Sequence, residues 1–183
     1  MANICSVEMK IVGKRPNIEL FISALEQKNK VYMGRGLYIT DLEFDDEAGC
    51  AILSGDCKWS IQSALIECAI RMRENPSIRL FKEVEDPKEL TFLTLDEACG
   101  MYNVSVEAFS TEPGCQFSEH YIVTPSGIEE NETCEYIETW LDHGEYPTKE
   151  AAEKELKVSI TDEDWENEAS IVIAGGFDVH YSI

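Results

Sequence analysis

Basic side chains are nearly absent from the second part of this sequence. Residues 101–183 contain 19 acidic residues but only three basic ones, all of them lysine, and no arginine follows Arg79. Residues 1–100 are more balanced, with 17 acids and 12 bases, and the whole chain has a net charge of −21. Such a surface repels nucleic acid and attracts basic proteins. We therefore expect a basic protein partner and no direct binding of nucleic acid, since no basic patch with interleaved aromatic residues is present.

Long apolar segments are lacking as well. No apolar run approaches the roughly 18 residues that a membrane-crossing helix needs. The opening MANICSVEMKIVG has neither the basic start nor the apolar stretch of a signal peptide. These absences predict a cytoplasmic protein that does not contact a membrane.

Closely spaced cysteine pairs are the third absence. The seven cysteines are odd in number and form no CxxC pair, so neither a zinc site nor a disulfide framework is indicated. The nucleotide, metal and hydrolase patterns GxxxxGK[ST], GxGxxG, HExxH, GxSxG and DxDxDG do not occur either. We therefore expect no metal, no cofactor, and cysteines that are reduced and mostly buried.

The residues that are present predict an α+β fold. Residues 3–12 alternate between apolar and polar, as in a half-buried strand, and residues 16–27 place an apolar stripe on one face of a helix. Two strands, 37–45 and 50–57, follow as a hairpin, and a second helix is expected over 60–73. The order is βαββα, with an antiparallel sheet.

The rest of the chain predicts a meander and a small extension. A short helix is expected from Thr94 to about Asn103, with Glu97 completing a capping box. Three strands, 104–109, 115–123 and 132–140, then form an antiparallel meander. Two short helices, starting near Thr148 and Thr161, and two closing strands around Gly175-Gly176 complete the prediction. The expected division is a domain over 1–141 and a small, acidic α/β extension over 142–183 packed on it.

The stretch EPGCQFSEHY, residues 112–121, offers candidates for catalysis. It places Cys115, Glu119 and His120 within six positions. In a strand, however, Cys115 and His120 point to opposite sides, and the neighbours Glu119 and His120 diverge. Asp56 in the GDCKWS turn could add a second acid, with Trp59 as a pocket wall or as an anchor of the strand–helix junction. A small hydrolase or nuclease that uses Glu119, His120 and Asp56 therefore remains one hypothesis.

Runs of acidic residues offer candidates for partner binding. TDEDWENE, residues 161–168, has a local explanation, because Thr161 can cap a helix whose first turn favours acids. That explanation does not cover the wider excess of acids. The candidate partner-binding residues are Asp162, Glu163, Asp164, Glu166, Glu168, Glu129, Glu130 and Glu132.

Several segments resemble the YubB-type ferredoxin-like family, which is carried by phages, plasmids and other mobile elements. The resemblance covers roughly residues 2–141 and lies in ANICSVEMKIVGKRPNIELFI, SGDCKWSIQSAL and TLDEACGMYNVSVEAFSTEPGCQFSEHYIV. Val7 departs from the family pattern, in which an asparagine is common one position earlier, where this chain has Ser6. The resemblance implies a ferredoxin-like βαββα core and a mobile-element origin in a bacterial host. The matching positions are Cys5, Gly13, Phe21, Gly55, Trp59, Glu112, Pro113, Gly114 and His120.

Charge and resemblance together suggest a function. Carboxylates can compete with DNA, which has about one charge per 1.7 Å of axis, for a basic protein channel. We expect a non-enzymatic inhibitor of a host defence nuclease, most concretely an anti-CRISPR protein and secondly an anti-restriction protein. The enzyme hypothesis stays open, as does an interaction module whose acidity serves solubility or reflects a halophilic host.

Overall fold

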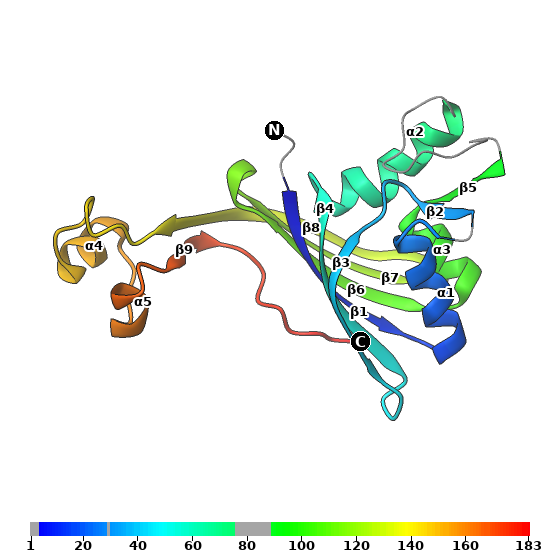
Figure 1. Ribbon diagram of the computed structural model, residues 1–183, viewed down its shortest axis with the longest axis horizontal. Helices are drawn as coiled ribbons and strands as arrows, with labels where there is room; N and C mark the ends of the chain where they lie inside the picture. Colours follow the sequence, from blue (N-terminus) through cyan, green and yellow to red (C-terminus); the bar gives the residue numbers. More distant parts are fainter. Residues whose placement is uncertain (1–3, 29, 76–88) are drawn as a thin grey trace.

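A seven-stranded antiparallel sheet organises the protein (Figure 1). The computed structural model describes residues 4–28, 30–75 and 89–183. The strand order is β3-β4-β1-β6-β7-β8-β9, and every neighbouring pair is antiparallel. The architecture thus mixes a large antiparallel sheet with a few helices, which agrees with the predicted α+β class. The strands are β1 (Ile4–Val12), β3 (Tyr38–Asp45), β4 (Cys50–Lys58), β6 (Ser105–Glu112), β7 (Phe117–Thr124), β8 (Gly127–Trp140) and β9 (Ser170–Gly175).

The helices of the body cover one side of this sheet, here named the helix side (Figure 1). They are α1 (Arg15–Leu25), the π-helix η1 (Gln62–Glu67) that continues into α2 (Cys68–Glu74), and α3 (Leu95–Tyr102). A short parallel pair, β2 (Val31–Met33) and β5 (Thr91–Leu93), lies beside them. None of the described helices combines the length and apolar character that crossing a membrane requires.

Alternation and helical periodicity build the core as predicted. In β1, Cys5, Val7, Met9 and Ile11 are buried on the helix side. The apolar stripe of α1 packs into the same cluster. The capping box of α3 also forms, because the Thr94 side chain accepts from Glu97 N and the Glu97 carboxylate accepts from Thr94 N.

The meander of β6, β7 and β8 is confirmed, but its boundaries shift. Cys115 is not in β7; it ends a short 3₁₀ turn, η3 (Pro113–Cys115), and Gln116 adopts a positive φ of 58° before the strand begins. β8 starts at Gly127, well before the predicted residue 132. Its first half is exposed and polar apart from Ile128, so no hydrophobic alternation marks it as a strand.

One predicted element is wrong. Among the described residues 170–183 there is one closing strand, β9, rather than two around Gly175-Gly176. Both glycines have positive φ, 67° and 88°, and a Cβ on Gly175 would collide with the carbonyl group of Glu135. The chain therefore turns away from β8 at this point. Residues 177–183, named the tail, return across the sheet without forming a strand (Figure 1).

Residues 141–169 form a separate lobe at the far end of β8 (Figure 1). The lobe contains α4 (Lys149–Leu156) and α5 (Asp162–Glu166), capped as predicted by the side chains of Thr148 and Thr161. It has its own small hydrophobic core, made by Leu141, Tyr146, Ala152 and Ile160. The ribbon of β8 and β9 connects the lobe to the body. The predicted extension thus has two parts: a lobe that stands off the body, and a tail that packs on it.

Candidate functional sites

Glu119 lies on the helix side, where it joins three elements. Strand alternation in β7 directs it inward, and it is only 4% exposed. One carboxylate oxygen, Oε2, accepts from the main-chain N–H of Ile61 and from Ser110 Oγ, each at 2.8 Å. Ile61 begins the helical segment that leads into η1, a position where an anion is favoured. The observed contacts thus give Glu119 the role of a buried cap that links β7, β6 and η1.

His120 lies on the opposite side of the sheet, here named the open side. Its Nε2 is 3.0 Å from Glu107 Oε1, and its ring stacks on Phe109 with 4.4 Å between ring centroids. Phe177 of the tail also packs against the His120 ring, with 5.6 Å between the two ring centroids. His120 is thus enclosed between the sheet and the tail.

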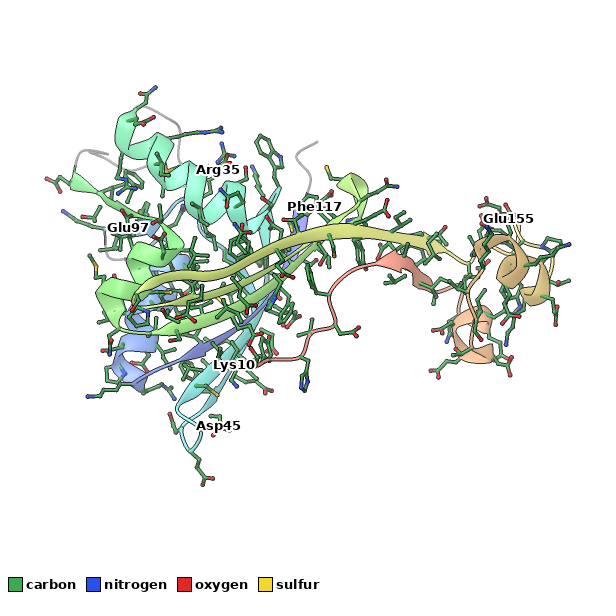
Figure 2. The ribbon with its side chains drawn as sticks, turned by 180° about the vertical axis from the view of Figure 1, so that it is seen from behind. Lys10, Arg35, Asp45, Glu97, Phe117 and Glu155 are labelled. Carbon is green, nitrogen blue, oxygen red and sulfur yellow. The ribbon has the colours of Figure 1, made fainter. Side chains whose placement is uncertain are left out.

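Glu107 holds the tail in place. Its carboxylate is 1% exposed and accepts from the main-chain N–H groups of Ser182 and Ile183, at 2.5 and 3.1 Å. Lys10 Nζ donates to the main-chain oxygen of Ile183, and Figure 2 shows Lys10 beside the end of the tail. The ring of Tyr181 packs edge-on against Phe109. Polar and aromatic contacts together therefore fasten the tail over the open side.

Acid is expected to release the tail from Glu107. Burial opposes ionisation of this carboxylate, but hydrogen bonds from Ser182, His120 and Ile183 outweigh it and lower the pKa below the ordinary 4.5. Because the folded pKa is the lower one, the stabilisation is complete above about pH 4.5 and declines as the pH falls through the folded value. Hydrogen exchange at the Ser182 and Ile183 amides, followed by NMR between about pH 6 and pH 3, should show protection falling with pH. Glu107→Gln should abolish that dependence, and unchanged protection in the natural protein would contradict it.

Asp56 lies apart from both Glu119 and His120. It points to the open side and accepts weakly from Ser6 Oγ at 3.4 Å. The register places Asp56 opposite Ser6, whose other neighbour, Thr111, pairs with Ser118. Three strand spacings, about 14 Å, therefore separate Asp56 from β7. The three residues of the enzyme hypothesis are not brought together: Glu119 faces the helices, while Asp56 and His120 lie on different parts of the open side.

Glu129, Glu130 and Glu132 lie on the exposed first half of β8. This half pairs with β7 on one edge, and no described strand pairs with its other edge, since β9 pairs only with Tyr136–Trp140. All three side chains are exposed, and no hydrogen bond or ion pair to a described residue involves them. They form the body end of an acidic row along β8.

The acids of TDEDWENE lie together on the lobe, but they differ in their contacts. Asp162 pairs with Lys149 at 2.6 Å, Asp164 accepts from Thr161 Oγ1, and Glu168 accepts from the main-chain N–H of His143. Within the described chain, Glu163 and Glu166 make no comparable side-chain contact. The lobe and the acids 129–132 lie at opposite ends of β8. At about 3.3 Å per residue, roughly 35 Å separates them.

Two contributors to the open side were missed from the sequence. Glu107 sits in the apolar run VSVEAF, where a lone acid between buried neighbours already indicates a buried partner. Nothing in the sequence indicates a partner for Lys10, because alternation predicts a solvated face for it. Comparisons of the chain with models of protein families, with curated protein sequences and with solved structures found no match in any of the three.

Proposed function

We propose that this protein is a non-enzymatic inhibitor that binds a nucleic-acid-binding defence nuclease in the cytoplasm of a bacterial host and occupies its basic DNA or RNA channel. An RNA-guided DNA nuclease of a CRISPR system is the most concrete target, and a restriction enzyme the second. One observation carries the proposal. Residues 127–169, which form β8 and the lobe, contain 15 acidic residues and only three lysines, and they run from the edge of the body, where β8 pairs with β7, out to the lobe (Figure 1).

The shape of this acidic segment suits a channel. β8 and the lobe form one elongated segment, named the projection, which begins at the edge of the body and ends in the lobe. Acids occur along it from Glu129 through Glu135 and Glu138 to α5. A row of about 35 Å is comparable with ten base pairs of duplex DNA at about 3.4 Å each. Acids without a protein partner, such as Glu163 and Glu166, can pair with lysine and arginine of a nuclease at little cost in internal contacts.

Ordinary structural roles explain part of the acidity. Charged residues on a free strand edge prevent edge-to-edge association, which fits Glu129, Glu130 and Glu132. Acids in a first helical turn favour the helix dipole, which fits Asp162 and Asp164. Neither role requires an excess of acidic residues along the whole length of β8 and the lobe. An experiment that compares acids on the projection with acids elsewhere therefore separates the two explanations.

The core of the body is proposed to be ferredoxin-like, and the chain to belong to the YubB-type mobile-element family. The supporting observation is the order β3-β4-β1-β6, in which β1 and β4 are the central strands and all neighbours are antiparallel. Along the chain, these strands alternate with α1 and with η1–α2 on one side, the split βαβ arrangement. A mobile-element protein of this kind would encounter host defence nucleases.

Neutralising the uncommitted acids is expected to abolish tight binding. Glu129, Glu130, Glu132, Glu163 and Glu166 would be changed together to glutamine in one variant. At about 0.5 kcal/mol for each exposed ion pair, the five changes should weaken binding to the nuclease roughly 50- to 100-fold. The measurements are the Kd for the purified nuclease and its cleavage of target DNA. Binding of the natural protein should also weaken steeply between about 50 and 200 mM salt.

A control variant carries acid-to-amide changes on the opposite edge of the sheet, at Asp41, Glu43 and Glu47 near the β3–β4 turn. These residues are exposed and lie on the body, away from the lobe. We expect this variant to inhibit nearly as well as the natural protein. Equal loss in both variants would show that only net charge matters, and no inhibition by the natural protein of either nuclease class would refute the proposed function.

A further inference from the structure

Two of the cysteines face each other across neighbouring strands of the sheet. Cys5, near the start of β1, lies directly opposite Cys57, near the end of β4. Residues opposite each other in antiparallel strands have Cα atoms about 4.5–5.5 Å apart, and their side chains share one side of the sheet. A disulfide spans Cα separations of about 4.4–6.8 Å. The register therefore places this pair within the separation that a disulfide needs, without movement of either strand.

Both thiols point to the helix side and are shielded from bulk water. Cys5 is 0% exposed and Cys57 is 4% exposed, and both belong to the main hydrophobic cluster. Hydrogen bonding from the Cys57 thiol lowers the pKa of Cys5 below its ordinary 9.0, although burial opposes ionisation. The same contact and burial raise the pKa of Cys57. The two sulfur atoms thus titrate as a unit, which releases its first proton more readily than an isolated thiol does.

A cavity of about 580 Å³ leads from the surface to Cys57. It opens between the end of α1, the turn at 34–37 and the adjoining ends of β3 and β4, and its apolar wall includes Leu37 and Ile39. Cys57 is part of this wall, whereas Cys5 is not. Cavities of about 300–1,000 Å³ hold drug-sized molecules. A small reagent can therefore reach Cys57 while the protein stays folded.

The other cysteines lack this combination of a facing thiol and an access route. In the described strands, Cys50 lies opposite Val12 and Asp45, and Cys134 lies opposite Ser118. None of the other five cysteines lines the cavity. Within the part of the chain that the structure describes, the facing pair of β1 and β4 is thus set apart from single thiols, which can form only mixed disulfides with a reagent.

We propose that Cys5 and Cys57 form a reversible disulfide between β1 and β4 when a low-molecular-weight disulfide, R–S–S–R, enters the cavity. Once the pair has lost one proton, the remaining proton moves to Cys5, and the Cys57 thiolate attacks one sulfur of the reagent. This step forms a mixed disulfide at Cys57 and releases RS⁻. The Cys5 sulfur then loses its proton and attacks Cys57 Sγ, which forms the protein disulfide and releases the second RS⁻. The two protons end on the two RS⁻ groups, so one R–S–S–R is reduced to two RSH as the dithiol is oxidised.

The disulfide acts as a staple at one end of the sheet. It joins the start of β1 to the end of β4, two interior strands, just before the chain enters η1. A covalent link between residues far apart in sequence restricts the unfolded chain, so the oxidised protein should unfold at a higher temperature than the reduced one. In a reducing compartment the pair stays as thiols, and a rise in small disulfides converts it. This property is independent of the proposed acidic surface.

The test uses bis(2-hydroxyethyl) disulfide, a small uncharged disulfide, added to the folded natural protein. After the remaining thiols are blocked, peptide mapping by mass spectrometry should find Cys5 joined to Cys57, with loss of the mass of two hydrogen atoms, and dithiothreitol should reverse the link. Cys50 and Cys57 fall on one tryptic peptide, so two variants assign the bond. Cys50→Ser should keep the link to Cys5, and Cys57→Ser should abolish it.

The kinetics of the natural protein test the access route without any variant. If the reagent enters through the cavity, a tenfold rise in its concentration should speed formation of the link about tenfold. A rate that stays constant over this range would show that oxidation waits for unfolding, and it would overturn the proposal. The exposed Cys115 reports that the reagent is active. Modification of Cys115 without any link between Cys5 and Cys57 would overturn the proposal as well.

Discussion

Replacing Glu119 by alanine is expected to lower the free energy of unfolding by about 3 kcal/mol. The change leaves the main-chain N–H of Ile61 and the hydroxyl of Ser110 without their acceptor in a buried place. Each lost hydrogen bond to a charged group costs about 1.5–3 kcal/mol, offset in part because a buried carboxylate no longer has to be desolvated. Urea unfolding followed by circular dichroism would measure the loss.

Two further variants make this prediction specific. Glu119→Gln keeps the size and one oxygen acceptor, so its cost should be about half that of alanine. Glu129→Ala removes an exposed acid of β8 and should change the stability by less than about 0.5 kcal/mol. A Glu119→Ala protein as stable as the natural one would refute the capping role. If either Glu119 variant instead lost a measured enzymatic activity at full stability, the enzyme hypothesis would regain support.

The features that sequence could predict are those set by near neighbours along the chain. Period-two alternation in residues 3–12 and the stripe Ile18, Phe21, Ile22 and Leu25 each identify a face that must be buried. The capping box at Thr94 needs only a residue three positions on. For the same reason, the predicted helices at Thr148 and Thr161 both form.

Features set by distant partners could not be predicted in this way. The parallel pairing of β2 with β5 joins residues about 60 positions apart, and neither three-residue strand has a pattern of its own. The prediction starts β8 too late because the exposed first half of the strand has a single apolar residue, Ile128, and therefore no apolar alternation. Gly175 and Gly176 suggest a strand pair in the sequence, but their positive φ angles end β9 and turn the chain into the tail.

At the candidate sites, too, the sequence predicts local features but not contacts between distant residues. Alternation correctly predicted that Glu119 and His120 point to opposite sides. Alternation could not predict the contact partner of either residue. Ile61, the partner of Glu119, and Glu107, the partner of His120, lie on elements that come close only through the folding of the sheet. As predicted, Asp162, Glu163 and Asp164 lie in the first turn of a helix, whereas Glu166 ends that helix and Glu168 lies beyond it. Their distance from Glu129, Glu130 and Glu132 follows from the length of β8, which the sequence understated.

Ending the chain after Gly176 is expected to lower the free energy of unfolding by about 3 kcal/mol. The truncation removes the tail, and with it the two main-chain donors to Glu107 and the aromatic contacts of Phe177 and Tyr181. Aromatic pairs contribute about 0.5–1.5 kcal/mol each. Truncation exposes Glu107 to water, which replaces the lost donors. The free energy lost at Glu107 is therefore smaller than that of two hydrogen bonds to a buried charge. Thermal unfolding should show a midpoint lower by roughly 6–12 °C for a chain of this size.

A double-mutant cycle isolates the part that passes through Glu107. In a Glu107→Gln background the charge is already gone, so truncation should cost about 1–2 kcal/mol less than it does in the natural protein. Asp178→Ala changes an exposed tail residue and should have little effect. Equal costs of truncation in both backgrounds would mean that Glu107 does not hold the tail, which would then rest on its aromatic side chains and on the contact of Lys10 with Ile183. An unchanged midpoint after truncation would mean that the tail does not rest on the sheet in solution, and His120 would then be open to solvent on a face that now reads as closed.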